Sequence, residues 1–166
     1  MNNAGIQQAK ECGEYLKASE WDVMITSPLK RAKRTAEIIH ENLLGVPLIK
    51  MNDFSERYFG DAEGMTVDER NATFSSRNYP NQEEMDSFKD RIMTGIKKVS
   101  QNYPDGKVLL VAHGAVINSI LSTLSKGKVG SGKTKLINAC ISNIQFQDEQ
   151  WGVKEINQVT HLSYYG

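Results

Sequence analysis

Two short apolar segments, each followed at once by the start of a helix, most constrain the fold of this chain. Residues 22–26 predict a buried strand, and Ser27-Pro28 after it is typical of a helix N-cap followed by proline at the first helical position. Residues 107–112 predict a second buried strand, with His113-Gly114 at its C-terminal end and a helix after it. Strands that alternate with helices indicate a layered α/β domain with a largely parallel sheet.

The remaining apolar periodicity agrees with this fold class. The spacing predicts helices over about residues 4–17, from Ser27-Pro28 toward Gly45, from Asn81 or Gln82 to residue 102, and over residues 116–124. Thr66 and Glu69 have the spacing of a capping box at the start of a short helix. Residues 46–50 predict a further strand, and residues 140–146 and 153–159 alternate like antiparallel edge strands.

Length and composition limit the classes of protein that remain. The chain has 166 residues and predicts one domain over 1–166. Its 20 Lys and Arg balance 20 Asp and Glu, which argues against a nucleic-acid partner bound by bulk electrostatics. The longest apolar run, residues 108–112, is far too short to span a membrane. The 2 Cys have no metal-ligand spacing and are typical of reduced thiols, so we expect a cytoplasmic protein.

Candidate functional residues come directly after the two buried strands. Ligands of parallel α/β sheets bind beyond the C-terminal ends of the strands, which directs attention to Ser27 with the helix after it and to His113-Gly114. Arg31 would lie in the first turn of a helix, where free N–H groups favour an anion and a guanidinium adds donors shaped for phosphate. His113 would point into a cleft as an anion ligand or an acid–base group. Lys30, Lys33 and Arg34 are better interpreted as a solvated basic face.

A third candidate lies in a loop rich in carboxylates, aromatic rings and glycines. The segment runs Phe54-Ser55-Glu56-Arg57-Tyr58-Phe59-Gly60-Asp61-Ala62-Glu63-Gly64. A carboxyl group desolvated by the rings of Tyr58 and Phe59 would have a raised pKa, as a proton donor requires.

These segments together resemble the histidine phosphatase superfamily, in its phosphoglycerate-mutase-like branch. The segment from Ser27 to Ala36 is similar to the family's S-x-L-x-R-A-x-x-T-A motif. The loop from Phe54 to Gly64 resembles L-x-E-x-x-F-G-x-x-E-G, with Phe54 in place of leucine. Residues 107–114 resemble the strand of the family's second histidine, and residues 138–142 resemble the late N-A-x-I-S stretch. The order and spacing agree over essentially the whole chain.

The resemblance implies a three-layer α/β/α fold with a mostly parallel sheet and a phosphohistidine mechanism without a cofactor or metal. A histidine nucleophile takes the phosphoryl group of a small phosphorylated molecule. Arg31 and His113 would bind the phosphate, and the catalytic Glu56 would protonate the leaving oxygen while His113 assists the nucleophile. The resemblance leaves the oligomeric state open.

The chain departs from the family in one respect. The family's first strand ends in Arg-His-Gly, whereas none of His40, His113 and His161 follows an arginine. The first nine residues resemble a family segment that comes after that strand, so we expect that about 20–30 preceding residues, including the first strand, are missing. Their loss would leave unpaired backbone groups beside residues 107–112, marginal stability and no phosphohistidine activity.

Three alternatives remain open beside an inactive phosphatase chain. A non-enzymatic pseudo-phosphatase could bind a phosphorylated ligand through Arg31, Glu56 and His113. A phosphoglycerate mutase is less favoured, because Phe59 stands where mutases of this family carry a tyrosine. Residues 127–134 match the nucleotide-binding pattern G-x-x-x-x-G-K-[ST], but the segment before them has helical rather than strand spacing.

Overall fold

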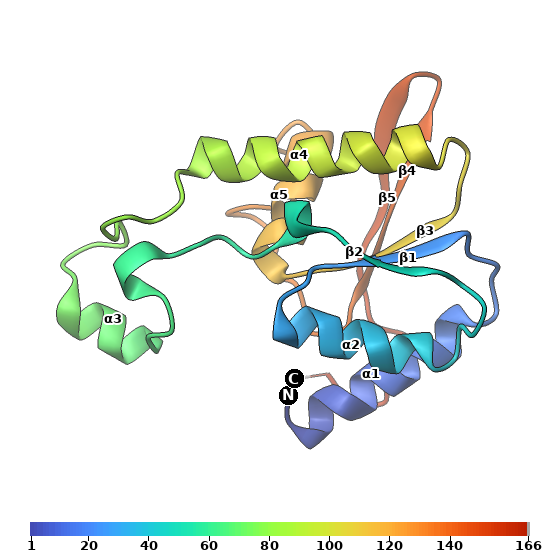
Figure 1. Cartoon of the computed structure of the whole chain (residues 1–166), viewed down its shortest axis with the longest axis horizontal. Coiled ribbons are helices and arrows are strands. Elements are labelled where there is room, and N and C mark those ends of the chain that lie inside the picture. The colour runs from blue at the N-terminus through green and yellow to red at the C-terminus, as the bar shows by residue number, and fades with distance from the viewer. Residues whose placement is uncertain (166) are drawn as a thin grey trace.

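The structure is a computed structural model that describes residues 1–165. Its centre is a parallel sheet in the order β2-β1-β3 (Figure 1). The three strands are β1 (Val23–Thr26), β2 (Leu48–Lys50) and β3 (Val108–Val111). Thr26 at the end of β1 pairs with Lys50 of β2 and with Val111 of β3, so the carboxyl ends of all three strands meet at one edge.

Helices cover both faces of this sheet and form three layers (Figure 1). One face carries α1 (Asn3–Leu16) and α2 (Lys30–His40), and the other carries α4 (Met85–Asn102) and α5 (Gly114–Leu124). Met24 of β1 packs with Cys12, Leu16, Ala36, Ile39 and Leu43 on the first face. Val23 and Ile25 pack with Phe54, Phe88, Ile92, Ile96, Val116 and Ile120 on the second face. The three-layer α/β/α fold expected from the sequence is therefore confirmed.

A separate antiparallel hairpin packs against the clusters on both faces of the sheet. It consists of β4 (Ile141–Gln147) and β5 (Gln150–Gln158), joined by Asp148 and Glu149, whose φ angles of 53° and 59° suit a tight turn. Ile144 packs against the α4/α5 side of the core and Ile141 against the α1/α2 side. Within residues 1–165, however, β4 pairs only with β5, and β3 pairs only with β1.

The loop after β2 leads away from the sheet to a short helix, α3 (Val67–Thr73) (Figure 1). It contains two single turns of 3₁₀ helix, η1 (Asn52–Phe54) and η2 (Gly60–Ala62). The predicted capping box is confirmed, because Thr66 and Glu69 each accept the other's backbone N–H. No residue of α3 is buried.

Three local features differ from the sequence expectations. Helix α2 begins at Lys30 rather than at Pro28, because the Ser27 hydroxyl accepts the N–H of Leu29 in a turn before the helix. Helix α4 begins at Met85, since Asn81 has a φ of 60° that no right-handed helix accommodates. Residues 108–111 are half-buried rather than buried, because β3 has a strand on one side only. None of the helices within residues 1–165 is both long and apolar enough to cross a membrane.

The unequal pairing of β1 and β3 predicts a measurable difference in backbone protection. β1 is bonded on both sides, whereas β3 leaves about half of its N–H and C=O groups without a strand partner. In amide hydrogen exchange we expect the amides of β1 to be uniformly slow and alternate amides of β3 to exchange far faster. Uniform slow exchange along β3 in a monomeric sample would contradict this assignment of a free edge.

Candidate active site

The ends of β1 and β3 bring two predicted site segments into contact. Ser27 follows β1 and is fully buried, and its N–H donates to the carbonyl of Val111 at 3.0 Å. His113 follows β3, and its Nε2 lies 2.8 Å from the Ser27 hydroxyl oxygen. The imidazole is therefore held at the carboxyl edge of the sheet, the place where ligands of parallel sheets bind.

The environment of His113 keeps its ring neutral near neutral pH. Burial lowers the pKa of His113, and the positive charge of Arg31 lowers it further. The ring can therefore offer both a donor and an acceptor nitrogen, one of which meets Ser27.

Arg31 stands exposed in the first turn of α2. The first N–H groups of a helix have no partner within the helix, and the helix dipole favours negative charge at that end. Lys33 and Arg34 point instead to Glu37, at 3.8 and 3.6 Å, as expected of a solvated basic face. Arg31 has no ion-pair partner among residues 1–165, so its guanidinium is free to receive an anion.

Glu56 is half-buried in the loop between η1 and η2. Burial raises the pKa of its carboxyl group, against the lowering effects of the Arg57 N–H and of the charges on Arg91 and Arg31. The Arg57 N–H donates to Glu56 Oε1 at 3.0 Å. A carboxyl with a raised pKa holds a proton at a higher pH than an exposed glutamate does, as a proton donor must.

Arg31 connects the three residues expected from the sequence. Its charge lowers the pKa of His113 and that of Glu56, so the three side chains share one electrostatic environment although they come from different segments. The aromatic rings expected to bury Glu56 have other neighbours. Phe59 packs under the guanidinium of Arg70, 4.6 Å from the ring centre, and Tyr58 is 55% exposed.

Sequence reasoning missed two residues of this region, Arg91 and Glu83, and one contact of Ser27. Ser27 was expected only to cap a helix, yet its hydroxyl contacts His113. Arg91 donates to the carbonyl of Ser55 from 36 residues away, and Glu83 pairs with Arg91. No local pattern identifies Arg91 or Glu83, because α4 meets the Glu56 loop only in the folded chain.

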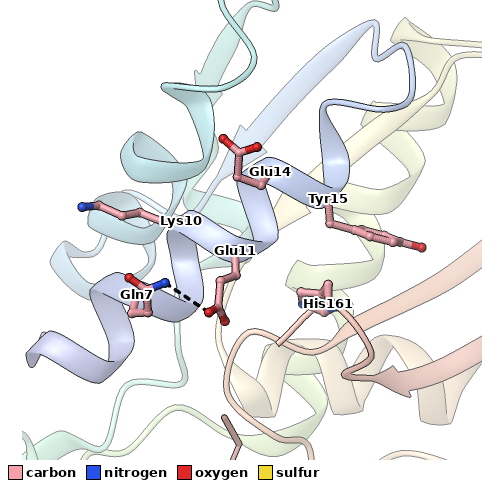
Figure 2. A pocket seen from close by; sticks show the side chains of 6 residues that line it. All are labelled: Gln7, Lys10, Glu11, Glu14, Tyr15 and His161. Carbon is pink, nitrogen blue, oxygen red and sulfur yellow. Dashed lines mark hydrogen bonds between the residues drawn. The ribbon is translucent and has the colours of Figure 1, made fainter. Parts of the chain in front are cut away.

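A second region of the surface carries no comparable arrangement. A shallow depression beside α1 is lined by Gln7, Lys10, Glu11, Glu14, Tyr15 and His161 (Figure 2). It contains none of the three candidate residues, and Glu11 is engaged there by Gln7 and Ser163. Among residues 1–165 no group of three or more His, Cys, Asp and Glu side chains is placed to hold a metal ion.

The segment that matches a nucleotide-binding pattern lacks the surroundings that such a loop needs. It follows helix α5 rather than a strand. Lys133 donates to the carbonyl of Gly127 at 2.5 Å, and the N–H of Gly130 donates to the Thr134 hydroxyl at 3.0 Å. The loop is thus closed on itself, in the arrangement of a structural turn.

Comparison with known proteins identifies the class to which this chain belongs. The sequence profile of the "Histidine phosphatase superfamily (branch 1)" matches residues 1–159, and the chain is a member of that superfamily. It is 50% identical over 163 residues to "Uncharacterized phosphatase PhoE" of Bacillus subtilis, covering 98% of this chain and 84% of PhoE.

Two further proteins agree with this assignment. "Metal-independent phosphoserine phosphatase" of Arabidopsis thaliana is 30% identical over 179 residues, covering all of this chain and 74% of that protein. The solved structure of Bacillus stearothermophilus YhfR superposes with a TM-score of 0.89 at 22% identity, over 97% of this chain and 86% of that one, and so supports the fold.

The environment of His113 predicts how its titration responds to a single charge. We expect the pKa of His113, measured by NMR, to lie below the ordinary value of about 6.5. Arg31→Gln should raise it, because the variant removes a positive charge that disfavours the imidazolium. Arg34→Gln is the matched control, since Arg34 lies on the same helix beside Glu37 and should leave the titration unchanged. An unchanged pKa of His113 in Arg31→Gln would show that the charge of Arg31 does not act on His113.

Proposed function

We propose that this chain binds the phosphate of a small phosphomonoester at Arg31 and His113, as part of a phosphatase that works through a phosphohistidine. One observation carries the proposal: His113 lies at the carboxyl edge of the sheet, 2.8 Å from the hydroxyl of Ser27, and the helix that follows Ser27 carries Arg31, which has no ion-pair partner among residues 1–165. Membership of the histidine phosphatase superfamily supports this interpretation.

The phosphate would lie at the carboxyl edge of the sheet, in front of the first turn of α2. The free N–H groups of that turn and the fork of Arg31 would donate to its oxygens. His113, held by Ser27, would add a further donor without adding a second positive charge. Phosphoryl transfer depends mainly on positioning and on neutralising charge, which these groups supply.

Glu56 would give its proton to the oxygen of the leaving group. Because its pKa is raised, Glu56 is protonated to a greater extent than an exposed glutamate at the same pH. Proton transfer to the leaving oxygen avoids the release of an unstable alkoxide. No step of this binding and protonation requires a metal ion, and the name of the Arabidopsis relative describes a metal-independent phosphatase.

The nucleophile is the part that these 166 residues do not supply at the site. His40 Nε2 lies 2.6 Å from the carbonyl of Val46, and His161 Nε2 lies 2.8 Å from that of Ala139, so both rings are engaged elsewhere. His113 is the histidine at the carboxyl edge of the sheet, where its ring contacts Ser27. We therefore propose that this chain binds a phosphomonoester but does not form a phosphohistidine, and that turnover needs a further histidine.

Within the family we favour a phosphatase over a mutase. Phe59 stands where mutases of this family have a tyrosine, and its ring packs under Arg70 rather than offering a hydroxyl group. The relatives named as phosphatases support the same choice. We also infer a cytoplasmic location, because Cys12 and Cys140 are free thiols and the expected substrates are small phosphorylated molecules.

A second candidate, a phosphate-binding pseudo-phosphatase, is favoured by the same missing nucleophile. The coding DNA upstream of Met1 distinguishes the two. An in-frame segment that ends in Arg-His-Gly would assign this chain to an active enzyme, whereas a stop codon directly upstream would favour the pseudo-phosphatase.

Phosphate binding tests the proposed site directly. Isothermal titration calorimetry with inorganic phosphate should detect binding to the wild-type chain. Arg31→Ala should weaken it by about 10- to 100-fold, because a hydrogen bond to a charged group contributes about 1.5–3 kcal/mol. Arg34→Ala is the control, since its side chain is exposed and paired with Glu37. Equal affinity of both variants for phosphate would show that Arg31 is not a phosphate ligand.

The missing nucleophile predicts that binding is not followed by turnover. We expect no hydrolysis of 4-nitrophenyl phosphate above background by the purified chain, and no acid-labile phosphate attached to the protein after incubation. Hydrolysis at a rate typical of the family would overturn this part of the proposal, and an acid-labile phosphate located on His113 would identify that residue as the nucleophile.

A further inference from the structure

We infer that Arg91 and Glu83 form a positioning pair that holds Glu56 in place, by bracing the backbone on both sides of it. The inference rests on the proposed function, in which Glu56 is the proton donor. Neither residue lies in the loop that carries Glu56: Glu83 precedes α4, and Arg91 lies within that helix.

On the side before Glu56, Arg91 holds three backbone carbonyl groups. Its Nη1 donates to the carbonyl oxygens of Asp53 and Ser55, at 2.9 and 3.0 Å, and more weakly to that of Asn52 at 3.3 Å. Ser55 directly precedes Glu56. One nitrogen of a planar guanidinium therefore fixes the end of η1 and the residue that leads into the proton donor.

On the side after Glu56, Glu83 holds the next two residues. The Glu83 N–H donates to the carbonyl of Tyr58 at 2.8 Å, and Arg57 Nε donates to the carbonyl of Glu83 at 2.9 Å. The Tyr58 N–H also faces the Glu83 carboxylate at 3.4 Å. The segment around Glu56 is thus bonded to residue 83 through both main chain and side chain.

A bidentate ion pair joins the two braces. Arg91 Nε donates to one carboxylate oxygen of Glu83 at 2.9 Å, and Nη2 donates to the other at 2.8 Å. The side chains are only 27% and 19% exposed, so water competes little for these bonds. Each side chain also neutralises the charge of the other, which would otherwise be partly buried without a partner.

Helix α4 makes this pair a rigid support rather than a flexible surface contact. Gly95, four residues after Arg91, packs so closely that an added Cβ would come within 2.7 Å of the Asp53 Cβ and 2.9 Å of the Phe54 ring. Lys98, on the same helix face, pairs with Asp53 at 2.8 Å. Three positions on one side of α4 therefore hold η1, and only Arg91 reaches on to Ser55.

Positioning and simple electrostatics predict opposite effects on Glu56. The charged groups that act on its carboxyl are Arg31 from α2, Arg91 from α4 and Glu63 from its own loop. If Arg91 acted only as a nearby positive charge, its removal would raise the pKa of Glu56. If Arg91 keeps the carboxyl in its buried position, its removal lets water reach the carboxyl and lowers that pKa toward the ordinary glutamate value of about 4.3.

The test compares Arg91→Gln, Arg91→Lys and Lys98→Gln with the wild-type chain. The carboxyl carbon of Glu56 is titrated by NMR, and amide exchange is followed at residues 55–58. For both Arg91 variants we expect a lower pKa of Glu56 and exchange at least about tenfold faster, since lysine cannot reproduce the fork. Lys98→Gln removes the neighbouring ion pair on the same helix and should leave both measurements unchanged.

Two results would overturn the inference. One is a folded Arg91→Gln variant in which the pKa of Glu56 rises or stays constant. The other is full rescue by Arg91→Lys, because any single positive charge would then suffice. If Arg91→Gln does not fold, Glu83→Gln takes its place, because it keeps the backbone bonds to residues 57 and 58. Faster amide exchange at residues 55–58 is then the required result, since loss of the Glu83 charge by itself lowers the pKa of Glu56.

Phosphate titration keeps this result separate from the proposed function. Phosphate contacts Arg31 and His113 in that proposal, so Arg91→Gln should bind inorganic phosphate within about twofold of wild type. Failure of the wild-type chain to bind phosphate would refute the proposed function, while the NMR comparison would still decide whether Arg91 and Glu83 hold Glu56 in place.

Discussion

The parallel register between β1 and β3 is the constraint on which the candidate site depends. Because Thr26 pairs with Val111, the residues that follow them, Ser27 and His113, leave the sheet at the same edge and meet at hydrogen-bond distance. A shift of one residue in this pairing would turn the side chains of one strand to the opposite face. It would also separate the start of α2, and Arg31 with it, from the imidazole.

The third component depends on packing rather than on strand register. Glu56 lies in a loop, and loops hold a side chain accurately only when their backbone is tied to something rigid. Helix α4 provides that support, because Gly95 admits Phe54 to close contact and Arg91 binds the carbonyl groups of η1. The site therefore combines two side chains placed by the sheet with one placed by a helix on its α4/α5 face.

The sequence predicted the elements from local patterns, and the ends of two predicted strands pointed to Arg31 and His113 as candidates. Glu56 became a candidate among several loop carboxylates only through the family resemblance. Apolar spacing placed the helices, and the Thr66 capping box was correct in detail. The sequence could not predict that the Ser27 hydroxyl would bond to both Leu29 and His113, since the second contact joins residues far apart in the chain. Burial of β3 was overestimated for a related reason: an apolar run indicates a strand but not how many neighbours the strand has.

The opposite pKa shifts of Glu56 and His113 have a common cause, since burial favours the neutral form of each group. The charge of Arg31 lowers both pKa values, with opposite consequences for the two groups. It favours the neutral form of His113 but disfavours the neutral, protonated form of Glu56. Under the proposed function, an arriving phosphate dianion would offset the charge of Arg31 and bring negative charge close to Glu56. Both changes raise the pKa of that carboxyl, so the proton donor would become protonated when the substrate that needs its proton is bound.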